Sequence, residues 1–98
     1  MALSEIQSEH QRLVILRCLA EVPGFQLNES ILHDSLNRAG VPTSRDAVKM
    51  QLEWLREMGL VKITQMASFY VAELTGRGAD VVSGVARVPG IKVPRPGG

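Results

Sequence analysis

The sequence predicts a mainly helical domain that carries a small β-hairpin. Three segments with helical spacing of apolar residues occupy residues 4–58, and each is followed by a glycine or a proline that ends a helix. The spacing then changes to alternation within residues 61–74, which is typical of two strands. With 98 residues, of which 45% are hydrophobic, the chain has the length and composition of one globular domain.

Composition excludes several classes of protein. The single cysteine, Cys18, excludes an intramolecular disulfide and argues against a secreted, disulfide-rich module. No apolar run approaches the ~20 residues that cross a bilayer. The first residues lack the basic and apolar regions of a signal peptide. We therefore expect a cytoplasmic protein with no membrane contact.

The first helix is expected from about Ser4 to Glu21. Ser4 with Gln7, or Ser8 with Gln11, has the spacing of a capping box at its start. One broad apolar face has helical spacing and consists of Ile6, Leu13, Leu16, Leu19 and Ala20. This helix is longer than a three-helix core needs.

The second and third helices begin with N-cap residues and end with glycines. Asn28 is expected to cap the second helix, which ends at Gly40. Thr43 or Ser44 is expected to cap the third helix, which ends at Gly59. Their apolar faces are Ile31, Leu32 and Leu36, and Val48, Leu52 and Leu55.

A hairpin and a short helix follow. Residues 61–64 and 69–74 are the expected strands, and residues 65–68 have the length of a hairpin loop. Thr75 is expected to cap a last helix from Ala79 to Ala86.

The order helix, helix, short turn, helix, hairpin, helix fits a winged helix-turn-helix. Three segments carry a resemblance to a known family. They are residues 44–48 at the start of the third helix, residues 52–61 from the end of this helix into the first strand, and residues 70–78 after the turn of the hairpin. The stretch from Asn28 to Thr75 resembles the winged-helix transcription regulators of the arsenic-repressor (ArsR-like) and multiple-antibiotic-repressor kind. The resemblance implies a winged-helix domain over residues 1–86.

A narrower resemblance rests on residues 27–30 together with residues 86–97. These segments are similar to small proteins encoded in Mu-like bacteriophages and prophages. This resemblance supports the fold more than any function.

In the winged-helix regulators, the third helix enters the major groove of DNA. Carried over by position, the contact set is Thr43, Ser44, Arg45, Asp46, Lys49, Met50 and Glu53. The candidate DNA-binding residues among them are Thr43, Ser44, Arg45, Lys49 and Met50. The alternative interpretation is that Thr43 and Asp46 only cap the helix and that Arg45 and Lys49 form a solvated face.

The charges are unevenly distributed. The net charge is −2 over residues 1–43, zero over residues 44–86 and +3 over residues 87–98. The last segment holds three of the five prolines, so we expect a basic tail that is extended or disordered. Its cations, Arg87, Lys92 and Arg95, are candidates for phosphate contacts.

The expected wing departs from the pattern of DNA-binding wings, because no basic residue lies between Lys62 and Arg77. The leading hypothesis is a dimeric DNA-binding protein, a phage or prophage transcriptional regulator, whose partner is double-stranded DNA. The alternative is a winged-helix module, such as a phage adaptor, that binds another phage protein and no DNA.

Dimerisation is expected through the first and last helices, as in the resembled regulators. The candidate interface residues are Leu3, Ile6, Leu13, Val81, Val82 and Val85. We expect no enzymatic activity, cofactor or metal, because the chain shows no catalytic motif and no ligand spacing among Cys18, His10 and His33.

Overall fold

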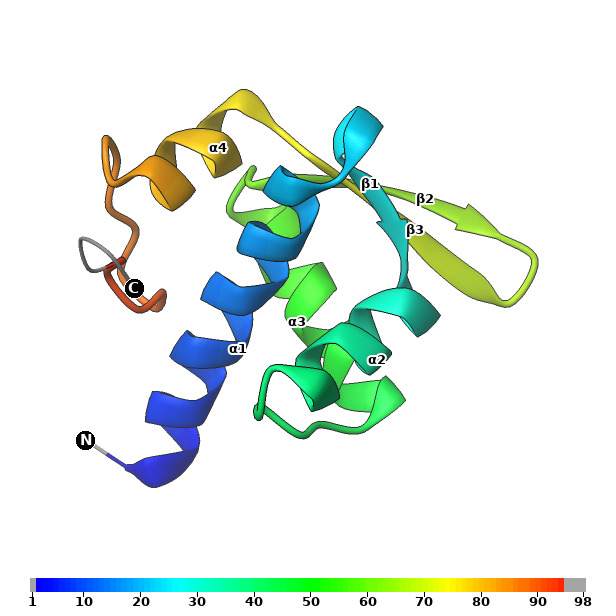
Figure 1. The fold of residues 1–98 in the computed structure, drawn as a ribbon, viewed down its shortest axis with the longest axis horizontal. Coiled ribbons are helices and arrows are strands. Elements are labelled where there is room, and N and C mark those ends of the chain that lie inside the picture. Colours follow the sequence, from blue (N-terminus) through cyan, green and yellow to red (C-terminus); the bar gives the residue numbers. More distant parts are fainter. Residues whose placement is uncertain (1, 95–98) are drawn as a thin grey trace.

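The longest helix, α1 (Leu3–Glu21), runs through the middle of the computed structural model, and the other elements surround its C-terminal part (Figure 1). The structure describes residues 2–94. After α1 follow η1 (Pro23–Phe25), β1 (Gln26–Asn28), α2 (Glu29–Arg38), α3 (Arg45–Glu57), β2 (Val61–Met66), β3 (Phe69–Leu74) and α4 (Gly76–Ser83). The predicted mainly helical fold with a small antiparallel sheet is confirmed.

Helix α1 buries its C-terminal part and leaves its first turns in solvent. Residues 2–7 are exposed, whereas Leu13, Val14, Ile15, Leu16 and Leu19 are buried. Ala2 occupies the N-cap position and no side chain caps the helix, so the capping boxes predicted at Ser4 or Ser8 are wrong. Neither α1 nor any other helix within residues 2–94 has the length and apolarity needed to span a membrane.

The caps of α2 and α3 follow the sequence. Asn28 Oδ1 accepts a backbone N–H three residues later at 2.9 Å, and Ser44 Oγ does the same at 3.1 Å. Of the two candidate caps of α3, Ser44 is therefore the one used. Gly40 and Gly59 adopt φ angles of 78° and 75°, which favour glycine and end the two helices as predicted.

The sheet has three strands in the order β1-β3-β2, with β3 antiparallel to both neighbours. The sequence did not predict β1, which pairs with β3 from Gln26↔Glu73 to Asn28↔Val71. The pairing of β2 with β3 extends to Met66↔Phe69 and leaves only residues 67–68 in the turn. The hairpin is therefore longer than predicted, and its loop is two residues instead of four.

Helix α4 begins earlier than predicted because a glycine is needed near its start. Thr75 Oγ1 accepts the N–H of Gly78 at 3.0 Å, so Thr75 caps the helix as expected. Gly78 packs against the backbone carbonyl of Leu60, and a Cβ at Gly78 would overlap that oxygen. The helix runs from Gly76 to Ser83 instead of from Ala79 to Ala86. The close packing of Gly78 against Leu60 outweighs the low helix propensity of glycine.

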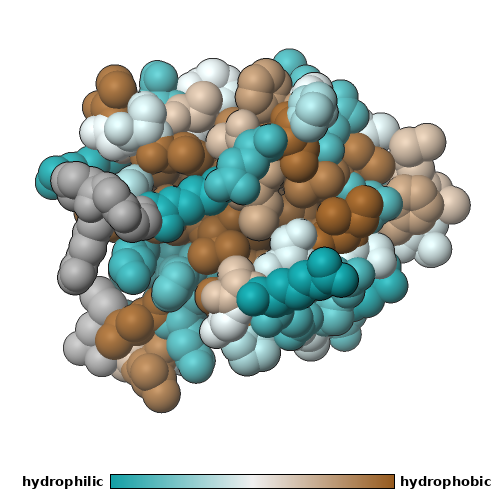
Figure 2. Space-filling model, in the orientation of Figure 1, coloured by the Kyte–Doolittle hydropathy of each residue, from teal (hydrophilic) through white to brown (hydrophobic). Residues whose placement is uncertain are grey.

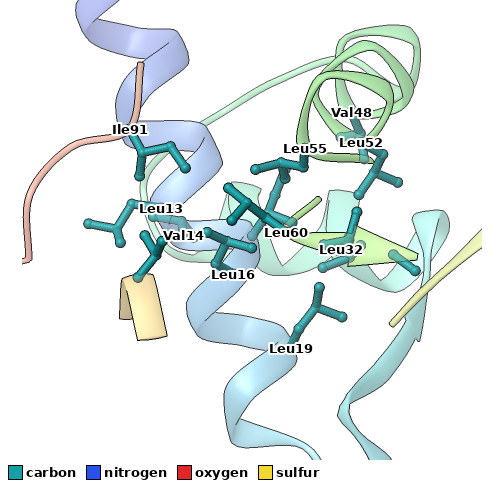
Figure 3. Packing of buried hydrophobic residues seen from close by; sticks show 14 of the residues in the cluster. Leu13, Val14, Leu16, Leu19, Leu32, Val48, Leu52, Leu55, Leu60 and Ile91 are labelled. Carbon is teal, nitrogen blue, oxygen red and sulfur yellow. The ribbon is translucent and has the colours of Figure 1, made fainter. Parts of the chain in front are cut away.

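Residues 87–94, here named the C-terminal strap, contain no helix or strand but pack against the domain. Val88 and Ile91 are buried and belong to the same core as the leucines of α1 and α3. Figure 3 shows Ile91 beside Leu13 of α1. The hydrophobic core therefore extends past residue 86, where the sequence placed the domain boundary, and the described part of the predicted tail is not a separate segment.

Candidate nucleic-acid interface

The cations predicted to contact DNA lie at the N-terminal end of α3. Arg45 is the first residue of the helix and Lys49 follows about one turn later, so both side chains lie on the same side. Ser44 is exposed, Thr43 is half-buried in the connector before α3, and Met50 is 72% exposed. The structure thus brings the two cations together at this end of the helix, whereas Met50 lies inside α3 and points about 100° away from Lys49.

Both cations are paired with one buried carboxylate, which the sequence analysis missed. Arg45 Nη2 and Lys49 Nζ lie 3.6 Å and 3.8 Å from Glu29 Oε2. Glu29 is the first residue of α2 and is fully buried. The backbone N–H of Tyr70 donates to Glu29 Oε1 at 2.7 Å, whereas Oε2 accepts no hydrogen bond from the described residues. Glu29 therefore joins α2, α3 and β3 at one point.

A periodic signal in the sequence marks Glu29 as buried. Glu29, Leu32 and Leu36 are spaced by three and four residues, so one face of α2 carries all three side chains, and all three are buried. A carboxylate on an apolar face needs a partner. This spacing therefore predicts a buried ion pair, although it does not identify the cations.

Lys49 also connects α3 to the β2–β3 turn. Its Nζ donates to the backbone oxygen of Ser68 at 3.4 Å and lies 5.7 Å from the centroid of the Tyr70 ring. The turn between β2 and β3 is thus placed beside the N-terminal part of α3. The turn itself adds no positive charge, because residues 65–68 are neutral.

The remaining cation of α3 is engaged elsewhere. Arg56 donates to Glu53 Oε2 at 2.9 Å, and this hydrogen bond raises the pKa of Arg56. Arg45 and Lys49 carry two positive charges, and the buried Glu29 together with Asp46 in the first turn of α3 carries two negative charges, so the N-terminal end of α3 has no net charge.

A second cluster holds the C-terminal strap against α1 and α3. Arg12 of α1 donates from Nε to Gln51 Oε1 at 2.7 Å and from Nη1 to the oxygen of Gly90 at 2.8 Å. The guanidinium lies 3.9 Å from the centroid of the Trp54 ring. Burial lowers the pKa of Arg12, although Glu9 opposes the shift. This cluster closes the fold across 78 residues of sequence.

The predicted tail cations do not join Arg45 and Lys49. Arg87 and Lys92 are exposed on the strap, and the backbone N–H of Lys92 donates to the oxygen of Glu9 on α1 at 3.2 Å. The strap meets α3 near its C-terminal end, at Trp54. Arg95 lies outside the described residues.

The predicted dimer interface is only partly at the surface. Leu3, Ile6 and Val85 are exposed, and Val82 is half-buried. Leu13 and Val81 have exposed fractions of 1% and 2% because they fill the core of this chain, so neither can line a dimer interface. Figure 2 shows apolar surface at the free end of α1, at the lower left.

The residues that the structure describes contain no group of three or more His, Cys, Asp and Glu side chains that could hold a metal ion. Cys18 is half-buried on α1, and burial is the main cause that raises the pKa of its thiol.

Comparison with known proteins places the chain among phage proteins. No protein-family model and no solved structure matches it. It is 48% identical over 94 residues to a protein of Escherichia phage Mu named uncharacterized protein gp26, and the match covers 96% of this chain and 97% of the phage protein. It is also 44% identical over 78 residues to an uncharacterized protein of Haemophilus influenzae, covering 79% of this chain and 76% of that protein. This chain belongs to the family of the phage Mu protein gp26.

Proposed function

We propose that this protein has a winged-helix fold and binds double-stranded DNA as a phage or prophage transcriptional regulator. The order α1-β1-α2-α3-β2-β3-α4 supports the fold, because a helix pair with a short connector is followed by a two-stranded hairpin. In this proposal α3 is the recognition helix and the β2–β3 hairpin is the wing.

One observation carries the proposal. Arg45 and Lys49 lie at the N-terminal end of α3, and Lys49 contacts the β2–β3 turn through the oxygen of Ser68. Recognition helices contact DNA with their N-terminal residues, and arginine and lysine contact both phosphates and guanine. The contact of Lys49 with the turn therefore places the two cations of α3 beside the hairpin, the second element that a winged-helix protein uses.

We further propose that two copies bind one duplex. The first turns of α1 lie free of the core and expose Leu3 and Ile6, and Val85 is exposed after α4. A two-fold pair through these residues would repeat α3 on the same side of the dimer. The two recognition helices would then face successive major grooves, about 34 Å apart.

Titration of the protein against duplex DNA at about 50 mM and about 200 mM salt tests the proposal. We expect Arg45→Ala to weaken binding and to reduce the slope of log affinity against log salt by about 0.9, the value for one lost phosphate contact. The matched control is Arg77→Ala, which removes the same charge from an exposed position on α4. Failure of the wild-type protein to bind at about 50 mM salt refutes the proposal.

The second candidate function is a protein-interaction module. Met66 is 53% exposed at the end of β2 and pairs across the hairpin with Phe69, and Met50 is exposed on α3. Figure 2 shows weakly apolar surface at this end of the molecule, at the right. Methionine-rich surfaces suit protein partners, and the turn has no cation for the minor groove.

A photo-crosslinking amino acid in place of Met66 separates the two candidates. In phage-producing cells, the DNA-binding proposal expects a crosslink to DNA. The protein-interaction candidate expects a crosslink to one phage protein and no retention of DNA.

A further inference from the structure

We infer that Glu29 is a built-in competitor for the phosphate that Arg45 and Lys49 would bind. The inference rests on the proposed DNA-binding function and names a device that regulates it. In the free protein, the Glu29 carboxylate occupies the place of an anion between the two cations. Binding of DNA then requires both cations to exchange Glu29 for phosphate.

The distances show that the cations are held loosely. Arg45 Nη2 and Lys49 Nζ lie 3.6 Å and 3.8 Å from Glu29 Oε2, whereas a charge-assisted hydrogen bond measures about 2.7–2.9 Å. Glu29 Oε2 accordingly accepts no hydrogen bond within the described part of the chain. A phosphate oxygen offers both cations the shorter contact that Glu29 does not provide.

The carboxylate cannot follow the cations outward. Its other oxygen, Oε1, accepts the backbone N–H of Tyr70 at 2.7 Å, and the side chain is fully buried under α3 and the hairpin. The cations are different, because Arg45 and Lys49 keep 52% and 38% of their side chains exposed. The mobile partners are therefore the two that face solvent.

When Arg45 and Lys49 move away from Glu29, the protein loses the energy of these ion pairs, and this loss opposes the binding of DNA. A buried carboxylate that loses its counter-charges is strongly destabilised. A phosphate contact by Arg45 or Lys49 stabilises the complex only where it is stronger than the lost contact with Glu29. Close phosphate contacts therefore form, and distant ones do not. Glu29 thus lowers the affinity of the surface for anions, including the phosphates of DNA.

The variant Glu29→Gln tests the inference, because glutamine keeps an oxygen for the Tyr70 N–H and removes the negative charge. We expect this variant to bind duplex DNA about fivefold more tightly than the wild-type protein at low salt. The slope of log affinity against log salt is expected to steepen by up to about 0.9. Glu57→Gln is the matched control, since it changes the net charge of the protein equally but removes an exposed carboxylate at the C-terminal end of α3, away from Arg45 and Lys49. We expect its effect to stay below that of Glu29→Gln.

A measurement on the wild-type protein avoids any loss of folding in the variant. Duplex DNA is titrated into labelled protein, and NMR follows the Arg45 guanidinium, the Lys49 ammonium and the Tyr70 amide. We expect the two cation signals to shift as they leave Glu29 and the Tyr70 amide to shift least, because its hydrogen bond is retained.

The outcomes separate the inference from the proposed function. Binding of DNA by wild type and Glu29→Gln with equal affinity and slope, or binding without movement of the cation signals, overturns the inference and leaves DNA binding intact. Absence of binding by both proteins at about 50 mM salt overturns the proposed function and the inference with it.

Discussion

Replacing Gly90 with alanine should destabilise the protein by about 2–5 kcal/mol. Gly90 has a φ of 99°, and a left-handed backbone costs an L residue about 1–2 kcal/mol. A Cβ at Gly90 would also lie 2.7 Å from Trp54 Cζ2 and 3.0 Å from Cη2, whereas carbon atoms pack best at about 3.5–4.0 Å. Overpacking of this kind costs about 1–3 kcal/mol more.

Gly84→Ala is a control that carries only the backbone part of this cost. Gly84 has a φ of 85°, close to that of Gly90, but a Cβ there would meet no atom within 4 Å. We therefore expect Gly84→Ala to lose about 1–2 kcal/mol. The difference between the two variants measures the contact of the C-terminal strap with Trp54.

Urea unfolding followed by circular dichroism gives the two stabilities. Trp54 is the single tryptophan of the chain, so its fluorescence reports directly on the strap. We expect the native emission of Gly90→Ala to move to longer wavelength and that of Gly84→Ala to stay unchanged. Equal destabilisation by the two variants, with unchanged emission in both, would refute the packing described for Arg12, Trp54 and Gly90.

Three further predictions concern single side chains. Ala67 has a φ of 53° in the β2–β3 turn, so Ala67→Gly should raise the free energy of unfolding by up to about 1 kcal/mol in urea titrations. Burial, Lys92 and Arg17 lower the pKa of His10 from 6.5. The unfolded chain therefore binds the proton more tightly, and the free energy of unfolding falls as pH drops below 6.5. Urea unfolding at about pH 7 and about pH 5.5 should show a smaller fall in this free energy for His10→Gln than for the wild-type protein. Burial raises the pKa of Cys18, so a thiol reagent should label it more slowly in the native protein than in urea; equal rates would contradict this.

Local chemistry made the helix starts predictable. Asn28, Ser44 and Thr75 cap the helices that follow them because a short polar side chain can accept a nearby backbone N–H. The prediction was wrong at α1, where serines with the right spacing lie inside the helix and Ala2 precedes it. A capping box is a local pattern, and α1 extends past two such patterns.

Strand β1 and the start of α4 depend on contacts between distant residues. The three residues of β1 form a strand only because β3 supplies their hydrogen bonds. Helix α4 begins at Gly76 because Gly78 allows a close approach to Leu60. Neither partner is visible from the neighbouring sequence, so local propensity gave the wrong answer at both places.

The predicted DNA-contacting residues of α3 were placed by resemblance, and the structure adds what surrounds them. The spacing of Glu29 with Leu32 and Leu36 could have indicated its burial, but pairing with Arg45 and Lys49 depends on how α2 and α3 pack. The cluster of Arg12, Trp54 and Gly90 has no local signal, since its members come from three distant segments.

The position of the C-terminal strap has a consequence for synthesis of the protein. Arg12 and Gly90 are 78 residues apart along the chain, and a ribosome adds about 5–20 residues per second. For roughly 4–16 seconds, the nascent chain therefore has α1 but lacks the residues that cover Leu13 and hold Arg12. An apolar helix surface exposed for that long is open to transient association, and a chain that ends before Val88 would lack two of the buried residues of the core.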